Sequence, residues 1–234
     1  MAPTEYRGVA RQENGSEMSK VEFPRATEGG DERRAHIEAA VVAVIARSGI
    51  ERLTVRAVAA AAGCSKGLVE HYFGNKASLV AAAADWANRT YLDRVRRAVG
   101  DQRGLAALEI RLRQLLPYRE EILHEWKARL AFWQQSSCDT RVADSSRSAF
   151  WQVHDQLLGD VQVARDEGQI PASVPLQETA ELVLVMLVGW STLCINNPRL
   201  REHAPLDRRL TMLLNLLRSG ELTGLVVGDP EVDY

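Results

Sequence analysis

Residues 54–76 read TVRAVAAAAGCSKGLVEHYFGNK, and this stretch decides the fold. Its first half carries apolar residues at the i, i+3, i+4 and i+7 spacing of one helical face, namely Val55, Val58, Ala59 and Ala62. Thr54 is placed to cap this helix, and Ser65 is placed to cap a second one. Gly63 stands between them, where a helix often ends in a left-handed residue that only glycine adopts without strain. The stretch therefore predicts a helix-turn-helix.

The second helix of this motif has one apolar face and one free face. Val69 and Phe73 lie four residues apart and are expected to point inward. The residues left to face outward are Leu68, Glu70, His71 and Tyr72. Because the second helix of a helix-turn-helix lies in the major groove of DNA, this outward face is predicted to contact DNA.

The same region resembles the DNA-binding domain of the tetracycline-repressor (TetR) family of one-component regulators. The resemblance rests on an ordered set of residues: Thr54, Val58, Ala59, Ala62, Gly63, Cys64, Ser65, Gly67, Val69, Tyr72, Phe73, Lys76 and Leu79. An apolar helix at residues 37–48 stands where the family has its first helix, and the match extends over residues 33–83. It implies an all-α fold with a three-helix head and a helical body that binds an effector and dimerises. Residues 65–76 (SKGLVEHYFGNK) are most similar to the betaine-pathway repressor branch.

Basic charge is concentrated in the predicted head, although the whole chain has a formal net charge of −2. Between residues 33 and 76, seven basic residues stand against three acidic ones, a local charge of +4. The basic residues are Arg33, Arg34, Arg47, Arg52, Arg56, Lys66 and Lys76, and the acidic ones are Glu38, Glu51 and Glu70. Such a local excess is expected where a protein contacts phosphates.

Five residues of the head are candidates for contacts to the DNA backbone or to guanine. Thr54 and Lys76 flank the motif and are expected to hold phosphates, and Tyr72 offers a hydroxyl to the backbone. Arg56 and Lys66 can each reach either a phosphate or the O6 and N7 atoms of guanine.

The remaining DNA-binding candidates lie on the second helix. Gly67 lets the helix approach the groove floor closely, Leu68 can touch a thymine methyl group, and His71 can reach a phosphate or a base edge. Glu70 has two interpretations. In the first, it accepts a hydrogen bond from cytosine N4, since a carboxylate without such a contact would weaken binding in the groove. Alternatively, it forms an i, i+4 ion pair with Lys66 and restrains that side chain.

The rest of the chain shows no signature of catalysis or metal binding. HExxH, GxGxxG and GxxxxGK[ST] are all absent, and the five histidines lack metal-ligand spacing. Three distant cysteines, Cys64, Cys138 and Cys194, are expected to be reduced and to pack as small hydrophobic residues. No signal peptide is expected, because the first thirty residues lack an apolar core, and the longest apolar run, residues 182–195, is shorter than a membrane span. A cytoplasmic protein without enzyme activity, metal or cofactor is predicted.

Helical periodicity continues through the body, and no segment alternates as a strand would. Helices are expected at residues 76–99, 105–116, 141–167, 178–195 and 206–217, with one more beginning at Pro117. The helix at 76–99 is interpreted as the only mechanical connection between head and body. The expected divisions are a disordered tail at residues 1–30, a DNA-binding head at 31–76, an effector-binding and dimerisation body at 77–219, and an acidic tail at 220–234. Met18 is an alternative start.

Large aromatic residues are frequent in the body and permit two interpretations. They either line an apolar effector cavity, where they can attract a quaternary ammonium by cation–π interaction, or simply pack in the core. The candidates for effector binding are Tyr118, Trp126, Leu130, Trp133, Trp151 and His154. The cavity is expected between the helix at 76–99, the helix carrying Trp126 and the helix at 141–167. An apolar or cationic organic effector is predicted.

The last two helices are predicted to form a homodimer as a four-helix bundle. The candidate interface residues are Leu184, Leu187, Trp190, Leu206, Leu210, Leu213, Leu214 and Leu217. A dimer would place two heads on a palindromic operator. The sequence therefore predicts a homodimeric repressor released from DNA by a small molecule. The alternative is a helical small-molecule-binding or interaction protein whose head no longer binds DNA.

Overall fold

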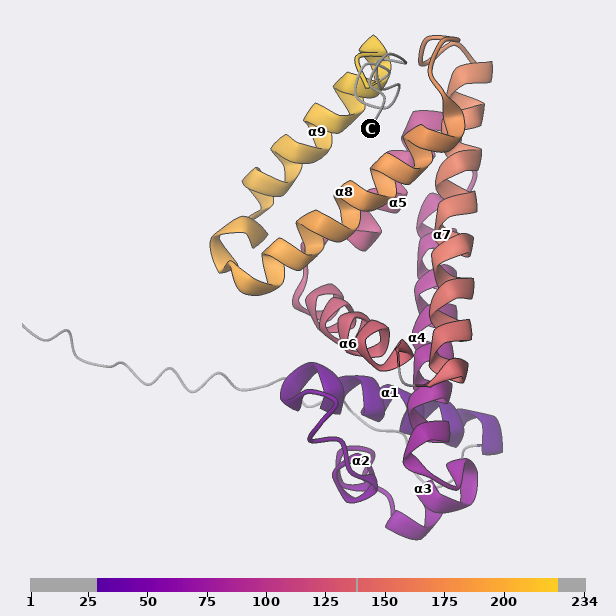
Figure 1. Cartoon of the computed structure of the whole chain (residues 1–234), viewed down its shortest axis with the longest axis vertical. Helices are drawn as coiled ribbons and strands as arrows, with labels where there is room; N and C mark the ends of the chain where they lie inside the picture. Colours follow the sequence, from indigo (N-terminus) through magenta and orange to yellow (C-terminus); the bar gives the residue numbers. More distant parts are fainter. Residues whose placement is uncertain (1–28, 138, 223–234) are drawn as a thin grey trace, which may run out of the picture.

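The computed structural model describes residues 29–137 and 139–222, and within these ranges it contains helices and no strands (Figure 1). The elements are α1 (Gly30–Ser48), α2 (Val55–Ala61), α3 (Lys66–Phe73), α4 (Lys76–Val99), α5 (Gly104–Leu115), α6 (Glu120–Ser136), α7 (Thr140–Asp166), α8 (Leu176–Asn196), the 3₁₀ helix η1 (Pro198–Arg201) and α9 (His203–Ser219). The all-α prediction is confirmed. Cys138, Met18 and most of both predicted tails lie outside the described residues.

The helix-turn-helix forms through the local signals that its sequence contains. The backbone N–H of Ala57 donates to Thr54 Oγ1 at 3.1 Å, and the N–H of Leu68 donates to Ser65 Oγ at 3.1 Å. These bonds satisfy N–H groups that have no partner inside their own helix. Gly63 has a φ of 60°, in the left-handed region that the turn between α2 and α3 requires.

Three helices start at least three residues away from the predicted position, and one of them is α9, which begins at His203 rather than Leu206. Helix α1 begins at Gly30 rather than Ile37, because Asp31 and Glu32 in its first turn interact favourably with the helix dipole. Pro117 does not open α6, which begins at Glu120. Instead, it ends α5, since a residue before proline avoids the helical region and Leu116 is extended, with ψ at 141°.

Helix α4 has the predicted bounds, but it is not the only connection between head and body. One cluster of buried residues holds the head together and includes Ala128 and Phe132 of α6. A second cluster forms the core of the body and includes Ile122 and Trp126, also from α6. Helix α6 packs directly on α1 (Figure 1), so it belongs to both cores and offers a second mechanical path.

Helix α8 is the most apolar element of the described chain. It has 21 residues and a mean hydropathy of 1.6 over an 18-residue window. By length and composition alone, the helix could cross a membrane. The apolar run at residues 182–195 is too short by itself, but the helix that contains it is longer. In the structure α8 packs against α7 and α6, and the contact with these helices explains much of its composition.

Candidate DNA-binding surface and effector cavity

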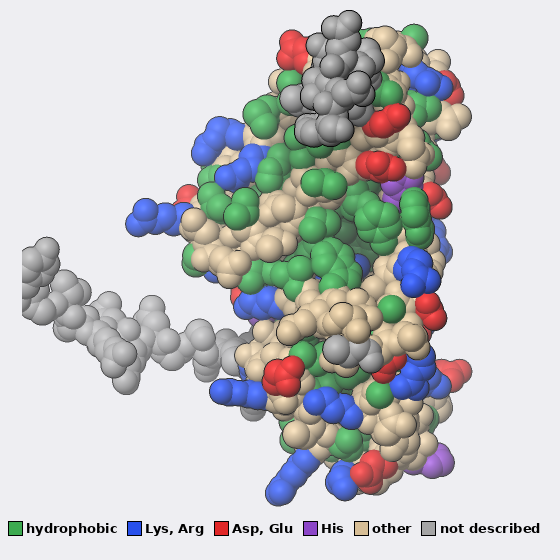
Figure 2. All heavy atoms as spheres, in the orientation of Figure 1, with side chains coloured by type: hydrophobic (Ala, Val, Ile, Leu, Met, Phe, Trp, Pro, Cys, Tyr) green, Lys and Arg blue, Asp and Glu red, His purple; other side chains and the backbone are tan. Residues whose placement is uncertain are grey.

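Helix α3 is anchored by its apolar face and presents the opposite face to solvent. Val69 and Phe73 are buried in the head, as predicted. Arg56 on α2 and Lys66, Gly67, Glu70 and His71 on α3 are exposed, whereas Leu68 and Tyr72 are half-buried. Lys and Arg side chains project from this end of the molecule, where Figure 1 places α2 and α3 (Figure 2). The structure thus brings most of the predicted DNA-binding residues onto one accessible surface.

Glu70 is paired with Lys66. Lys66 Nζ lies 2.9 Å from Glu70 Oε1, which is the i, i+4 ion pair that one interpretation of the sequence predicted. Both side chains remain exposed. Glu70 therefore restrains Lys66 and offsets its charge in the free protein, and the pair must adjust when phosphates approach.

Gly67 has no structural reason to be glycine within its own chain. It lies in the first turn of α3, and a Cβ atom built on it would meet only Ser65 Oγ, at 4.0 Å. Glycine in a helix is less stable than alanine by about 0.5–1 kcal/mol. The open space beside Gly67 on the exposed face leaves the backbone of α3 accessible to a close approach.

The other candidates have structural roles beside their predicted ones. Lys76 Nζ donates to the carbonyl oxygen of Ile50 at 3.4 Å, which links the start of α4 to the loop after α1. Tyr72 packs against the head core, and its hydroxyl lies close to Gly30. Asn75, which the sequence analysis did not single out, caps α4 by accepting from the N–H of Ser78 at 2.9 Å. Its position before Lys76 was the signal that could have found it.

The body contains a small cavity between α6, α7 and α8, rather than beside α4 as expected. It has a volume of about 30 Å³, and its lining residues are Leu115, Trp126, Arg129, Trp133, Ser146, Ala149, Phe150, Val153, Leu184, Leu187 and Val188. The rings of Trp126 and Trp133 meet edge to face, with 6.2 Å between their centroids. Of the predicted effector-binding residues, the structure brings these two tryptophans together at the cavity.

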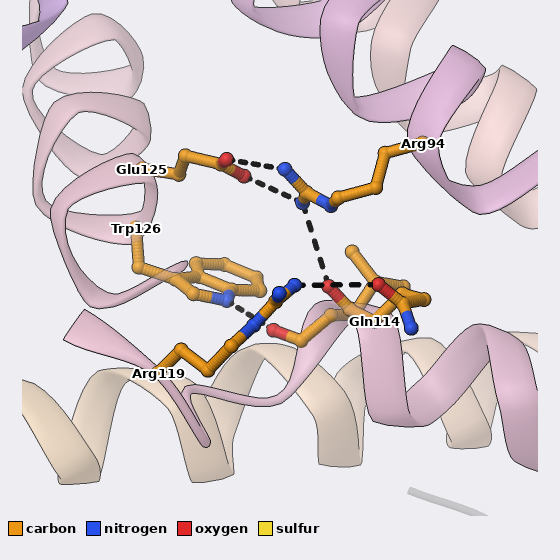
Figure 3. A network of polar contacts seen from close by, with 6 residues as sticks. Arg94, Gln114, Arg119, Glu125 and Trp126 are labelled. Atoms are coloured by element: carbon orange, nitrogen blue, oxygen red, sulfur yellow. Dashed lines mark hydrogen bonds and ion pairs between the residues drawn. The ribbon is translucent and has the colours of Figure 1, made fainter. Parts of the chain in front are cut away.

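Trp126 is held in place by a polar network at the junction of α4, α5 and α6 (Figure 3). Its Nε1 donates to the carbonyl oxygen of Leu115 at 2.6 Å. Beside it, Arg94 forms a two-pronged ion pair with Glu125, in which Nη2 donates to Oε2 at 2.7 Å. Arg94 Nη2 also donates to the Gln114 carbonyl oxygen at 3.4 Å. These bonds fix one wall of the cavity.

The other predicted effector-binding residues lie elsewhere. The hydroxyl of Tyr118 donates to Asp207 Oδ1 at 2.9 Å and so links the loop between α5 and α6 to α9. Leu130 is half-buried outside the cavity lining. Trp151 is 49% exposed on α7. His154 is buried but turned toward α8, where Gln177 Nε2 donates to its Nε2 at 3.1 Å.

The head matches the family model "Bacterial regulatory proteins, tetR family" over residues 37–83. This match covers the same helix-turn-helix whose capped, exposed α3 is described above. The head is therefore similar to the DNA-binding domains of that family. No curated protein matches the sequence, so the comparisons with solved structures supply the further relatives.

Solved structures of transcriptional regulators share the architecture of nearly the whole described chain. A transcriptional regulator from Rhodococcus sp. Rha1 is 26% identical, with a TM-score of 0.70 over 80% of this chain and 96% of that one. A TetR transcription regulator from Haloarcula marismortui is 21% identical, with a TM-score of 0.69 over 80% and 97%. A transcriptional regulator from Saccharomonospora viridis, in complex with choline, is 18% identical, with a TM-score of 0.70 over 80% and 95%. The protein is a DNA-binding transcriptional regulator.

In the body, the residues predicted for the dimer interface are mostly buried inside the subunit. Six of them are fully buried in the core of a single chain: Leu187, Leu206, Leu210, Leu213, Leu214 and Leu217. Leu184 is also buried, and Trp190 is half-buried. These seven leucines therefore have no free surface for a partner. For these leucines, an apolar stripe on a helix did not indicate which neighbour covers it, and dimerisation through the last two helices stays a prediction.

The apolar residues that remain exposed on α8 and α9 lie on different positions of the same helices. Val185 is 66% exposed, Leu193 is 56% exposed, and Gly189 lies between them at four-residue spacing on α8. Met212 on α9 is also exposed. Figure 2 shows apolar side chains gathered over the part of the surface where Figure 1 places α8 and α9. This face is available for a second subunit.

Proposed function

We propose that the protein is a homodimeric repressor that acts on DNA in the cytoplasm and releases its operator when a small organic effector binds the body. In this proposal, residues 31–76 form the DNA-binding head and residues 77–219 form the effector-binding and dimerisation body. The observation that carries it is α3, which has a capped start and an exposed face with Lys66, Gly67 and His71. This is the face that a helix-turn-helix lays in a major groove. The exposed stripe of α8 with Met212 supports dimerisation.

Two neighbouring residues of α4 support a route from the body to the head. Asn88 accepts a hydrogen bond from Arg129 Nη1 of α6 at 3.3 Å and donates to Ser145 Oγ of α7 at 3.3 Å. The next residue, Arg89, reaches Glu38 of α1, with 3.5 Å between Nη2 and Oε2. A ligand that moves Arg129 would therefore change the hydrogen bond of Asn88 on α4. The next residue of α4, Arg89, forms the ion pair with Glu38 of the head. Population shift between two head positions requires such a differential contact.

The betaine-pathway branch is a finer assignment within this function. Residues 65–76 favour it, and the Saccharomonospora viridis relative with choline in its structure supports an effector cavity in such bodies. The lining of the cavity opposes it, because Arg129 already places a cation at 5.6 Å from the Trp126 ring. A quaternary ammonium would meet like charge at that site.

A pair of head variants tests the DNA-binding function. An operator is first selected from a randomised duplex library with the wild-type dimer. Lys76→Ala is expected to weaken binding to the operator and to unrelated duplex by the same factor, because a phosphate contact carries no base information. The slope of log affinity against log salt concentration should become shallower by about one unit per subunit. Lys66→Ala is expected to weaken operator binding more than unrelated binding and to relax preference at one base pair, as measured by fluorescence anisotropy.

The thermal midpoint of both variants serves as the control, because Lys76 also donates to the Ile50 carbonyl oxygen. Wild-type DNA affinity in both folded variants would contradict the assignment of this surface to DNA. It would favour the alternative function, a helical small-molecule-binding or interaction protein whose head no longer binds DNA.

A further inference from the structure

The interior of the body contains hydrogen-bond donors that the described part of the chain leaves without acceptors. Tyr91 of α4 is 2% exposed, and its hydroxyl has no hydrogen-bond partner there. Arg94 Nε, one turn further along α4, is also buried without a partner. Burial raises the pKa of Tyr91 to about 12, so its hydroxyl keeps its proton at neutral pH. A buried donor without an acceptor is costly, and two on one helix indicate that an acceptor comes from outside the chain.

Three guanidinium groups surround Tyr91, and only two of them have a carboxylate partner. Arg94 is paired with Glu125, and Arg111 is paired with Asp160, with 2.6 Å between Arg111 Nε and Asp160 Oδ2. Arg129 is the third, and it acts on Tyr91 more strongly than the other two. Within residues 29–137 and 139–222, no carboxylate lies within 4.0 Å of its guanidinium. The cluster therefore holds one positive charge more than its carboxylates neutralise.

Arg129 is placed to present that charge to the cavity. Its guanidinium carbon lies 5.5 Å from the centre of the Tyr91 ring and 5.6 Å from that of Trp126, between two aromatic side chains. It makes one hydrogen bond to the described residues, to Asn88 Oδ1 at 3.3 Å, although a guanidinium carries five N–H donors. Burial lowers its pKa, which shows that the surroundings disfavour the charge. A half-buried cation without an ion-pair partner among the described residues lines a cavity whose other lining residues, apart from Ser146, are apolar.

We propose that the effector is an organic carboxylate, whose charged group binds Arg129 and whose apolar part lies among Trp126, Trp133 and the α8 side chains. This inference rests on the proposed function and specifies the ligand class of its effector site. A carboxylate accepts a two-pronged hydrogen bond from a guanidinium, which is the strong and geometrically specific way to satisfy the free N–H groups. It would also neutralise the excess charge of the cluster.

The size of the cavity implies that binding moves the protein. A volume of about 30 Å³ holds little more than one water molecule, whereas ligand sites usually occupy about 300–1,000 Å³. Trp133 on α6 and Phe150 on α7 are the large aromatic lining side chains with access to solvent, so their movement would open the site. Because α6 also packs on α1, opening this site displaces a helix that belongs to the head core. Carboxylate binding and DNA release are coupled through that displacement and through the Arg129–Asn88 bond.

Matched probes that differ only in their charged group test the proposal. The probes are 4-phenylbutyrate and 6-phenylhexanoate, the alcohols and amines with the same carbon skeletons, and choline. Binding to the full chain is measured without DNA by tryptophan fluorescence, because Trp126 and Trp133 line the site. The carboxylates should bind at least about tenfold more tightly than the matched alcohols, as a charge-assisted hydrogen bond implies, and the amines should bind more weakly still.

Variants of α6 identify the residue responsible. Arg129→Gln should remove the preference for carboxylate over alcohol, whereas Arg129→Lys should keep part of it because the charge remains. Lys127→Gln is the matched control, since it removes the same charge from the same helix at a position outside the cavity lining. Circular dichroism of each variant establishes that it is folded.

Three results would overturn the proposal: equal affinity for the carboxylates and alcohols, tighter binding of the amines or choline, or an unchanged carboxylate preference in Arg129→Gln. The absence of any carboxylate binding at millimolar concentration would do the same. Because these measurements contain no DNA, their failure leaves the DNA-binding function intact. A failure of operator binding, conversely, would leave the carboxylate preference standing.

Discussion

Gly67→Leu is expected to abolish specific operator binding while leaving the fold intact. The Cβ position is open, and leucine is a better helix former than glycine by about 1 kcal/mol, so the thermal midpoint should stay the same or rise. In the complex the added side chain would hold α3 away from the groove floor. If each head loses about 2 kcal/mol of base contacts, the two heads of a dimer lose about 4 kcal/mol, which is roughly a 1,000-fold loss of operator affinity.

The matched control is Gly159→Leu. Gly159 is also exposed within a helix, and a Cβ atom built on it would meet nothing within 4 Å, but it lies on α7 in the body. Operator binding of this variant should equal that of the wild type. If Gly67→Leu binds the selected operator normally, then α3 does not approach DNA through its glycine face, and the orientation of the head proposed above is wrong.

The double substitution Val185→Glu, Leu193→Glu is expected to convert the dimer into a folded monomer. Both side chains are more than half exposed in one subunit, so their replacement does not disturb its core. Around a two-fold axis the new carboxylates would face apolar surface and each other, which opposes association. Because a monomer engages one half-site at a time, operator affinity should fall by about 100-fold or more. Analytical ultracentrifugation gives the oligomeric state, and anisotropy gives the affinity.

Ala106→Glu provides the control for this experiment, since Ala106 is exposed on α5 and the substitution adds a charge away from the α8 stripe. It should remain dimeric and bind DNA normally. A double variant that sediments as a dimer would show that the subunits associate through another face. Substituting the buried Leu184 and Leu187 instead would not test the interface, because those changes would disrupt the core of each subunit.

The head could be predicted from sequence because its structure depends on local signals. Thr54, Ser65 and Gly63 act within a few residues of their own position, and the structure shows the two caps and the left-handed turn that they imply. The pairing of Glu70 with Lys66 is equally local. Such features need no knowledge of the tertiary contacts, and the match to the family model lies in the same region.

The body could be predicted only in its helices, because its site and faces depend on contacts distant in sequence. Glu125 and Arg129 have the i, i+4 spacing of an ordinary surface ion pair. In the structure, however, Glu125 forms its ion pair with Arg94, which lies 31 residues away. Arg129 instead lies against the Trp126 ring and lines the cavity. Trp151 shows the opposite case, since its spacing suggested a cavity and the structure leaves it half exposed.

The salt dependence of operator binding by the wild-type protein tests the central claim most directly. Arg56, Lys66 and Lys76 give each head three cations near the predicted phosphates, or six in a dimer. The duplex selected from the randomised library should therefore lose roughly 1,000-fold in affinity between about 50 and 200 mM monovalent salt. Selection that enriches no sequence, or binding that is insensitive to salt, would contradict a regulator that acts by binding DNA through this head.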